Sequence, residues 1–226
     1  MIGLIAAMQI ELEMLLEKTD VKEKKTVSGM TFTVGTLAEK TVVMTVCGEG
    51  KVNAALAAQT MILLYAPSLI INTGVAGSLS PDLGVGDTAV ASAVCQHDYD
   101  LSPLGYPKGR VLFPGGSADR FPTDKGVSEA ILDAAAALGV HTRLGVIATG
   151  DVFVADDGLK ASLVQAFDAI ACEMEGGAIG HACTLAGVPF AAIRAISDNA
   201  DDAKAFDPVS ASAVSVAITE RVLAKM

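Results

Sequence analysis

The chain has 226 residues, of which 51% are hydrophobic and 19% charged, a composition that favours one packed domain over residues 1–226 and excludes a disordered chain. Lys and Arg number 16 against 26 Asp and Glu, so the formal net charge is −10, and aromatic residues make up 4%. We therefore expect no nucleic-acid partner, because proteins that bind nucleic acids carry basic patches and aromatic stacking platforms.

The sequence also predicts a cytoplasmic protein without a membrane segment. The apolar start, residues 1–8, has no basic flank and is soon followed by Glu11 and Glu13, which is not typical of a signal peptide. No stretch of about 18 uncharged apolar residues follows, as a membrane span would require. The four cysteines occur singly and without C-x-x-C spacing, which favours small core residues in a reducing compartment.

Short runs rich in Val, Ile and Thr alternate with amphipathic stretches, and this alternation predicts strands connected by helices. In chain order we expect strand 2–7, helix 10–18, strand 41–46, helix 52–65, strands 69–73 and 88–95, helix 127–138, strand 143–149, helices 159–167 and 174–186, strand 189–196 and helix 209–223. The pattern indicates an α/β fold, a three-layer α/β/α sandwich around a largely buried sheet. The Gly- and Pro-containing region 102–122 is either a lid over a site or a surface segment.

Two glycine-containing loops follow predicted strands. One is residues 47–53, Cys-Gly-Glu-Gly-Lys-Val-Asn, and the other is residues 72–78, Asn-Thr-Gly-Val-Ala-Gly-Ser. Neither loop matches a phosphate-binding pattern, and either could be a simple turn. Because ligands of open α/β sheets bind at the carboxyl ends of the strands, we expect both loops to border one crevice.

Acidic residues in apolar surroundings are the strongest chemical signal in the sequence. Glu11 follows the first strand, Glu173 and Glu175 flank Met174, and Asp198 ends the strand before it. A carboxylate withdrawn from water needs partners or a raised pKa, so such residues are often functional. Each of them could also be a helix cap or a first-turn acid.

Other chemistries have weaker support. His97 lies near Asp98 and Asp100, but no second His has metal-ligand spacing, so a hydrogen-bonded structural histidine is favoured over a metal ligand. The chain has no G-x-S-x-G pattern for a nucleophilic serine.

Taken together, the motifs resemble those of the bacterial 5′-methylthioadenosine/S-adenosylhomocysteine nucleosidases over nearly the whole chain. The matching segments are Ala7-Met8 followed by Glu11, Gly48-x-Gly50-Lys51-Val52, residues 72–77, Gly150-Asp151-x-Phe153, Glu173-Met174-Glu175 and Arg194-Ala-Ile-Ser-Asp198. The resemblance implies the nucleoside phosphorylase fold with a twisted mixed sheet, a small nucleoside substrate, a homodimer, and neither a metal nor an organic cofactor.

The resemblance also implies residue roles. Asp198 would protonate N7 of adenine, Glu11 would activate water and Glu175 would hold the ribose hydroxyls, as in acid–base glycoside hydrolysis. The remaining substrate-binding residues implied in this way are Met8, Glu49, Ala76, Gly77, Tyr106, Phe153, Val154, Glu173, Met174, Arg194, Ser197 and Phe206. Of these, Arg194 and Ser197 would hold Asp198 in place. Leu101 and Leu104 would join Met8, Tyr106 and Phe206 around the 5′ substituent. Tyr106 and Leu104 would reach the neighbouring subunit's site.

Glu49 departs from the family pattern, which often has Ile or Val beside the 5′-thio group. An acid that faces the pocket would favour a polar or cationic 5′ substituent, whereas one that faces outward would have no such effect. Three other readings remain open: a phosphorylase of the same fold, a futalosine-type hydrolase and a non-catalytic nucleoside-binding module. Glu11 argues against the phosphorylase because it would repel phosphate, and the presence of both Glu11 and Asp198 argues against the binding module.

Overall fold

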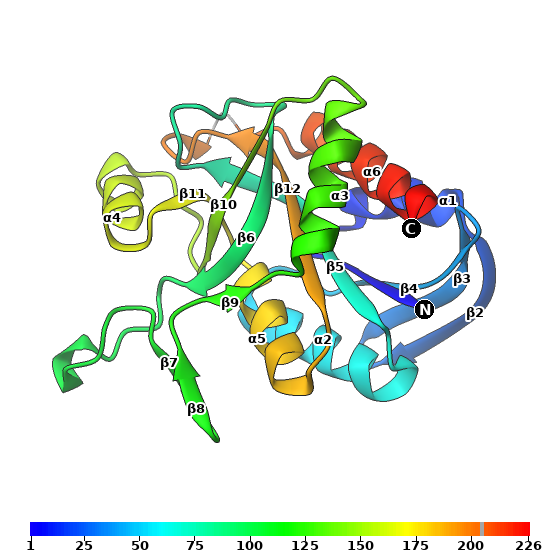
Figure 1. Ribbon diagram of the computed structural model, residues 1–226, viewed down its shortest axis with the longest axis horizontal. Coiled ribbons are helices and arrows are strands. Elements are labelled where there is room, and N and C mark those ends of the chain that lie inside the picture. The colour runs from blue at the N-terminus through cyan, green and yellow to red at the C-terminus, as the bar shows by residue number, and fades with distance from the viewer. Residues whose placement is uncertain (204–205) are drawn as a thin grey trace.

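The computed structural model describes residues 1–203 and 206–226. A mixed β-sheet lies at its centre, with helices on both faces (Figure 1). In spatial order its strands are β11 (Ala169–Glu173), β10 (Thr142–Thr149), β6 (Thr88–Gln96), β12 (Phe190–Asp198), β5 (Leu69–Ser78), β1 (Ile2–Ala6), β4 (Lys40–Val46), β3 (Met30–Leu37) and β2 (Asp20–Val27), and β9 (Phe121–Pro122) pairs with β6.

Helices cover the two faces of the sheet, which confirms the predicted α/β/α layers (Figure 1). Helices α2 (Lys51–Tyr65) and α5 (Gly176–Ala186) pack together on one face, and α3 (Lys125–Ala136), α6 (Pro208–Lys225) and the short α1 (Glu13–Glu17) lie on the other. Helix α4 (Asp157–Phe167) lies beside β10 and β11. The 3₁₀ turn η2 (Ser102–Leu104) and the hairpin of β7 (Val111–Phe113) and β8 (Gly116–Ala118) project from the body (Figure 1).

The fully buried strand β5 divides the hydrophobic core into two parts. Successive side chains of a strand point to opposite faces, so Ile70 packs into the cluster under α2 and α5, while Ile71 packs into the cluster under α3 and α6. All ten residues of β5 are buried. This burial on both faces explains why the strand carries no charged residue and why apolar and polar residues do not alternate along it.

The sheet partly closes on itself, and this closure builds the site. Strand β12 pairs in parallel with β5, and the end of β5 also pairs antiparallel with β11, where Gly77 faces Cys172. The β5–β12 register ends at the pair Gly77 and Asp198. The ends of three strands therefore meet around Gly77.

The structure differs from the sequence prediction mainly in the N-terminal third, with smaller differences at the bounds of later elements. The predicted helix over 10–18 is wrong as a single element, because a 3₁₀ turn η1 (Gln9–Glu11) precedes α1 and Leu12 lies between them. Residues 20–37, for which no element was predicted, form the β2–β3 hairpin. The strand predicted over 69–73 continues to Ser78, and the helix predicted from 174 begins at Gly176.

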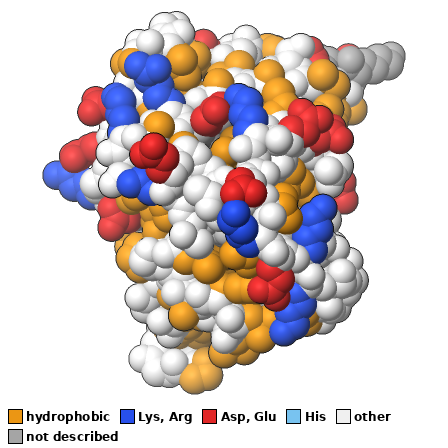
Figure 2. Space-filling view, turned by 90° about the vertical axis from the view of Figure 1, so that its right-hand side faces the viewer, with side chains coloured by type: hydrophobic (Ala, Val, Ile, Leu, Met, Phe, Trp, Pro, Cys, Tyr) orange, Lys and Arg blue, Asp and Glu red, His pale blue; other side chains and the backbone are white. Residues whose placement is uncertain are grey.

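Charges of both signs are interspersed on the surface seen in Figure 2, which views the molecule from the side where β2 and β3 lie in Figure 1. Exposed ion pairs such as Lys18–Glu220, with 2.6 Å between Nζ and Oε2, fit this pattern. Within the described part of the chain, none of the helices has the length and apolar character needed to cross a membrane.

Candidate active site

A pocket of about 240 Å³ opens where β1, β5, β11 and β12 end. It is lined by most of the residues that the sequence predicted: Met8, Glu11, Glu49, Ala76, Gly77, Phe153, Val154, Glu173, Met174, Glu175, Ser197, Asp198 and Phe206. Sequence reasoning had not selected its other lining residues, Ala7, Val75, Val152 and Cys172. Each of these four residues is next in the sequence to a residue that was selected. Extending each predicted segment by one residue would therefore have found them.

Two predicted site residues lie outside the pocket lining. Arg194 is 1% exposed and lies beneath the pocket, where it pairs with Glu173 and Glu175 rather than holding Asp198, as the resemblance had implied. Tyr106, together with Leu101 and Leu104, belongs to the projecting segment around η2 and does not line the pocket of its own chain. Residues 102–122 therefore form no lid over this pocket within one chain.

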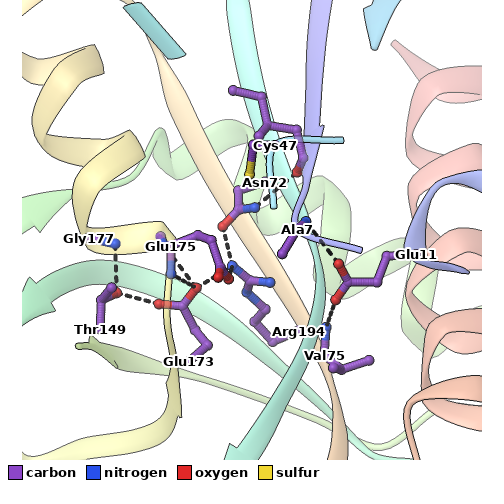
Figure 3. A network of polar contacts seen from close by, with 12 residues as sticks. Ala7, Glu11, Cys47, Asn72, Val75, Thr149, Glu173, Glu175, Gly177 and Arg194 are labelled. Carbon is purple, nitrogen blue, oxygen red and sulfur yellow. Dashed lines mark hydrogen bonds and ion pairs between the residues drawn. The ribbon is translucent and has the colours of Figure 1, made fainter. Parts of the chain in front are cut away.

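Glu11 is held rigidly by backbone donors that follow β1 and by one within β5 (Figure 3). Its Oε2 accepts hydrogen bonds from the amides of Ala7 and Met8 at 2.9 and 2.8 Å, and its Oε1 accepts one from the amide of Val75 at 2.9 Å. Burial raises the pKa of Glu11, and the charge of Arg194 and the three hydrogen bonds oppose this effect. The result is a fixed carboxylate with increased basicity.

Glu173, at the end of β11, is the main partner of Arg194 (Figure 3). Its carboxylate also accepts hydrogen bonds from the Thr149 hydroxyl and from the amides of Glu175 and Gly176, the latter two at 3.1 and 2.7 Å. Since Gly176 begins α5, Glu173 acts as an acid at a helix N-terminus, the structural role that the sequence left open for it.

Glu175 is the member of the Glu-Met-Glu motif that is placed for a ligand. Its Oε1 accepts a hydrogen bond from the Gly50 amide at 2.9 Å, and its Oε2 lies 3.5 Å from Nη2 of Arg194. Burial, and then the nearby charge of Glu173, raise the pKa of Glu175 to about 7. The carboxyl therefore changes its charge near neutral pH.

Asp198 lies at the opposite part of the pocket, against Gly77. The Ser197 hydroxyl donates to Oδ2 at 2.9 Å, and the Ala200 amide donates to Oδ1 at 2.8 Å. A Cβ on residue 77 would come within 2.9 Å of Oδ1, so a side chain there would displace the acid. Glycine at 77 is required by this close approach.

Two aromatic rings border the pocket beside Asp198. Phe153 and Phe206 meet edge to face, with ring centroids 5.5 Å apart and an angle of 84° between the planes. Phe153 remains 48% exposed, which leaves its ring available to stack on a planar ligand. Its loop is fixed because the Lys51 amide donates to Asp151 Oδ1 at 2.7 Å.

His97 makes no ligand-like arrangement. Its backbone amide donates to the Thr149 carbonyl at 2.8 Å, whereas its ring atom Nε2 is buried without a hydrogen-bond partner among the described residues, so that part of the predicted hydrogen bonding is absent. Across residues 1–203 and 206–226, no three His, Cys, Asp or Glu side chains are grouped to hold a metal ion.

Comparison with known proteins identifies the family. The family model described as the phosphorylase superfamily matches residues 1–224, and the chain belongs to that superfamily. A 5′-methylthioadenosine/S-adenosylhomocysteine nucleosidase of Shewanella halifaxensis is 39% identical over 203 residues, which cover 89% of this chain and 87% of the relative. Within the superfamily, the chain belongs to these nucleosidases.

Solved structures agree with this assignment. The nucleosidase of Neisseria meningitidis, determined in complex with methylthio-immucillin-A, matches with a TM-score of 0.94 and 34% identity over 100% of this chain and 99% of that one. The futalosine hydrolase of Helicobacter pylori matches with a TM-score of 0.93 and 32% identity over 100% of this chain and 97% of that one. The nucleoside phosphorylase-like fold expected from the sequence is thus confirmed.

Proposed function

We propose that the protein hydrolyses the N-glycosidic bond of 5′-substituted adenosines, releasing adenine and the 5′-substituted ribose. Membership of the nucleosidase family supports this activity, as does the structural match to a nucleosidase bound to methylthio-immucillin-A. The substrates in this class are 5′-methylthioadenosine, S-adenosylhomocysteine and 5′-deoxyadenosine. The observation that carries the proposal is one pocket with two fixed carboxylates, Glu11 and Asp198.

Asp198 is the general acid in this proposal. As the bond between C1′ and N9 breaks, its electron pair moves into adenine, and a proton from Asp198 to N7 removes the charge that adenine would acquire. The hydrogen bonds from Ser197 and Ala200 fix the direction of the carboxyl. Phe153 would stack on the base, and Ala76, Gly77 and Val154 would offer close backbone contacts to its edge.

Glu11 is the general base, and it accepts a proton from the water that attacks C1′. Both carboxylates are positioned by β5, since Glu11 bonds to the amide of Val75 and Asp198 lies against Gly77. Two residues of a strand span about 6.6 Å. Inverting glycoside hydrolysis, in which a water lies between two carboxyl groups, uses separations of about 6.5–9.5 Å.

Glu175 would bind the 2′- and 3′-hydroxyls of the ribose through charge-assisted hydrogen bonds, and Met174 would lie against the sugar. Glu175 is suited to this role because the Gly50 amide holds only its Oε1. Arg194 and Ser197 would act indirectly, by positioning Glu175 and Asp198 respectively.

The charge of the pocket favours water over phosphate as the nucleophile. Among its described lining residues are five acids and no Lys, Arg or His. A phosphorylase must hold a phosphate dianion beside C1′, which needs compensating positive charge. Arg194 does not supply it, because its guanidinium is buried against Glu173 and Glu175.

A second candidate is a futalosine-type hydrolase, which the match to the Helicobacter pylori enzyme supports. It would use the same acid and base with a different 5′ arm. The 5′ substituent, rather than the chemistry of bond cleavage, separates the two candidates.

We further propose that residues 1–226 form one domain that assembles into a homodimer in the cytoplasm. Large apolar side chains are exposed on α2 and on the projecting segment, among them Val52 (71%), Leu63 (72%) and Leu104 (73%). Apolar surface of this kind marks an interaction site. Tyr106 would then reach the partner's pocket, and the buried free cysteines fit a reducing compartment.

The test of the oligomer is light scattering coupled to size exclusion. A dimer whose Tyr106→Ala variant loses kcat/KM for 5′-methylthioadenosine supports the assembly and the role of Tyr106. A monomer with full activity overturns both.

The test of the activity is adenine release, measured with and without phosphate. The substrates are 5′-methylthioadenosine, S-adenosylhomocysteine, 5′-deoxyadenosine, adenosine and aminodeoxyfutalosine. Phosphate-independent release from the 5′-substituted adenosines supports the nucleosidase, and preferential release from aminodeoxyfutalosine supports the second candidate. Release only with phosphate overturns the role of Glu11, and no release from any compound leaves a nucleoside-binding module.

A further inference from the structure

The pocket is lined by carboxylates of unequal exposure. Glu11, Glu173, Glu175 and Asp198 are all buried, whereas Glu49 is exposed at the rim. The four buried acids each accept hydrogen bonds from neighbouring backbone or side-chain donors. The carboxylate of Glu49 has no hydrogen-bond or ion-pair partner among the described residues, so it is the acid free to meet a ligand.

The backbone around Glu49 is fixed, which gives the side chain a defined location. The Asn53 side chain donates to the Glu49 carbonyl at 2.8 Å. The Gly48 amide donates to the Ala7 carbonyl at 3.0 Å, and the Gly50 amide donates to Glu175 at 2.9 Å. Glu49 therefore lies between the end of β1, next to Met8, and the ribose-binding carboxylate.

This location is at the ribose part of the pocket and not at the base part. Glu49 directly precedes Gly50, whose amide donates a hydrogen bond to Glu175. Asp198, Gly77 and Phe153 form the part of the pocket assigned to adenine. If Met8 contacts the 5′ substituent, as the family resemblance implies, a nucleoside whose base contacts Asp198 and whose ribose contacts Glu175 would extend its 5′ arm toward the rim beside Met8. The free carboxylate lies at this rim.

Lys51, the basic residue closest to Glu49 in the sequence, does not neutralise it. Lys51 is two residues away, but its Nζ forms an ion pair with Asp98 at 2.7 Å. The other acids of the pocket add to the negative potential instead of cancelling it.

We propose that Glu49 is a specificity-determining residue that favours 5′ arms carrying a protonated amine and disfavours arms carrying a carboxylate. This inference rests on the proposed hydrolysis of 5′-substituted adenosines. Because Glu49 is exposed, its effect is that of a solvent-screened ion pair, about two- to five-fold in kcat/KM. The substrate class selected is adenosine with an amino group a few atoms beyond the 5′ position.

The test uses three adenosines with 5′-thio arms of similar length and different charge: 2-aminoethylthio, propylthio and carboxymethylthio. Adenine release gives kcat/KM for each with the wild type, Glu49→Gln and Glu129→Gln, a matched change of an exposed glutamate on α3. We expect the amine-to-propyl ratio to fall about two- to five-fold in Glu49→Gln and to stay at the wild-type value in Glu129→Gln. High salt should reduce the wild-type ratio toward that of Glu49→Gln.

A second variant, Glu49→Lys, keeps the test decisive by reversing the charge. It should favour the carboxymethyl arm over the aminoethyl arm. Equal charge ratios in the wild type, Glu49→Gln and Glu49→Lys overturn the inference while leaving hydrolysis intact. Failure of the wild type to release adenine from any of the three arms overturns the proposed function itself.

Discussion

Arg194 and Glu173 form an ion pair beneath the pocket, and their side chains are only 1% and 3% exposed. The same guanidinium lies 3.5 Å from Glu175 and is the main opposing charge for Glu11. One buried cation thus supports three carboxylates, Glu11 after β1 and Glu173 and Glu175 at the end of β11. The proposed general base and the proposed ribose-binding acid are coupled through a residue that does not line the pocket.

Replacing Arg194 by Met should destabilise the protein, and the main cause should be the lost charge rather than lost packing. The three carboxylates would be left without a cation in a buried site, which costs about 3–5 kcal/mol of unfolding free energy at pH 8. The cost should be smaller at pH 5, because burial raises the pKa values of Glu11 and Glu175 and these two acids can then take up protons. Urea unfolding at both pH values measures this difference, and an equal loss at pH 5 and pH 8 would contradict the electrostatic explanation.

Gly74 separates Arg194 from Glu11, so Gly74→Ala should disrupt the site. An added Cβ would overlap Nη1 of Arg194 and Oε1 of Glu11. We expect a loss of about 1–3 kcal/mol in stability from overpacking and a fall of about 100-fold in kcat/KM from displacement of Glu11.

Gly84→Ala is the matched control for this change. A Cβ there meets only Asp87 Oδ2, at an ordinary 3.8 Å. This variant should have the same melting temperature and the same kcat/KM as the wild type. If both alanine variants behave alike, the close approach at Gly74 does not explain its effect.

The central strands and their helices were predictable because burial leaves a strong signal. Strand β5 begins with three apolar residues and carries no charge, and α2 and α6 occur close to their predicted bounds. Strand β2 was not predicted because apolar and polar residues hardly alternate along Asp20–Val27. Seven of its eight residues are exposed, as suits a charged edge strand.

The candidate acids were predictable one by one, but their partners were not. The carboxylate of Glu11 accepts hydrogen bonds from the backbone amides of Ala7 and Met8. These bonds interrupt the helix that the sequence predicted over residues 10–18. Likewise, the alternation Glu173-Met-Glu175 does not reveal that the first acid binds Arg194 while the second is held by Gly50. The Glu11 contacts span only three and four residues, but the pair of Glu173 and Arg194 is 21 residues apart and the contact between Gly50 and Glu175 is 125 residues apart, so both of these depend on how the chain folds.

Asp198→Asn should remove most turnover while leaving binding largely intact. The amide oxygen can still accept the hydrogen bond from Ala200, so the shape of the site is kept, but the side chain has no proton to deliver. We expect kcat to fall about 10²- to 10⁴-fold. Calorimetric titration with 5′-methylthioadenosine tests the binding, and weakened binding with an unchanged kcat would refute the acid role.

The pH dependence of kcat/KM should reflect the raised pKa of Glu11. A base must be unprotonated to accept a proton from water, so activity should fall as pH decreases through a value above the ordinary 4.5 for glutamate. The protonation of Glu175 near pH 7 should steepen this fall, because the neutral carboxyl binds the ribose less well. Rates measured from pH 5 to 9 test this, and full activity down to pH 5 would argue against both roles.

Glu175→Gln should make the protein more stable at pH 8 and less active. The folded chain keeps the Glu175 proton up to about pH 7, whereas the unfolded chain loses it near 4.5, so the folded state binds more protons within this window. The unfolding free energy of the wild type therefore decreases as pH rises from 4.5 to 7.

Glutamine carries no charge at either pH, and its oxygen can still accept the Gly50 hydrogen bond. We expect it to gain about 2–3 kcal/mol over the wild type at pH 8 and little at pH 4.5. Its KM for 5′-methylthioadenosine should rise through loss of the charged ribose contact. Thermal melts at the two pH values, with Glu129→Gln as the exposed control, provide the measurement. A variant less stable than the wild type at pH 8 would show that the Arg194 contact outweighs the burial of the charge.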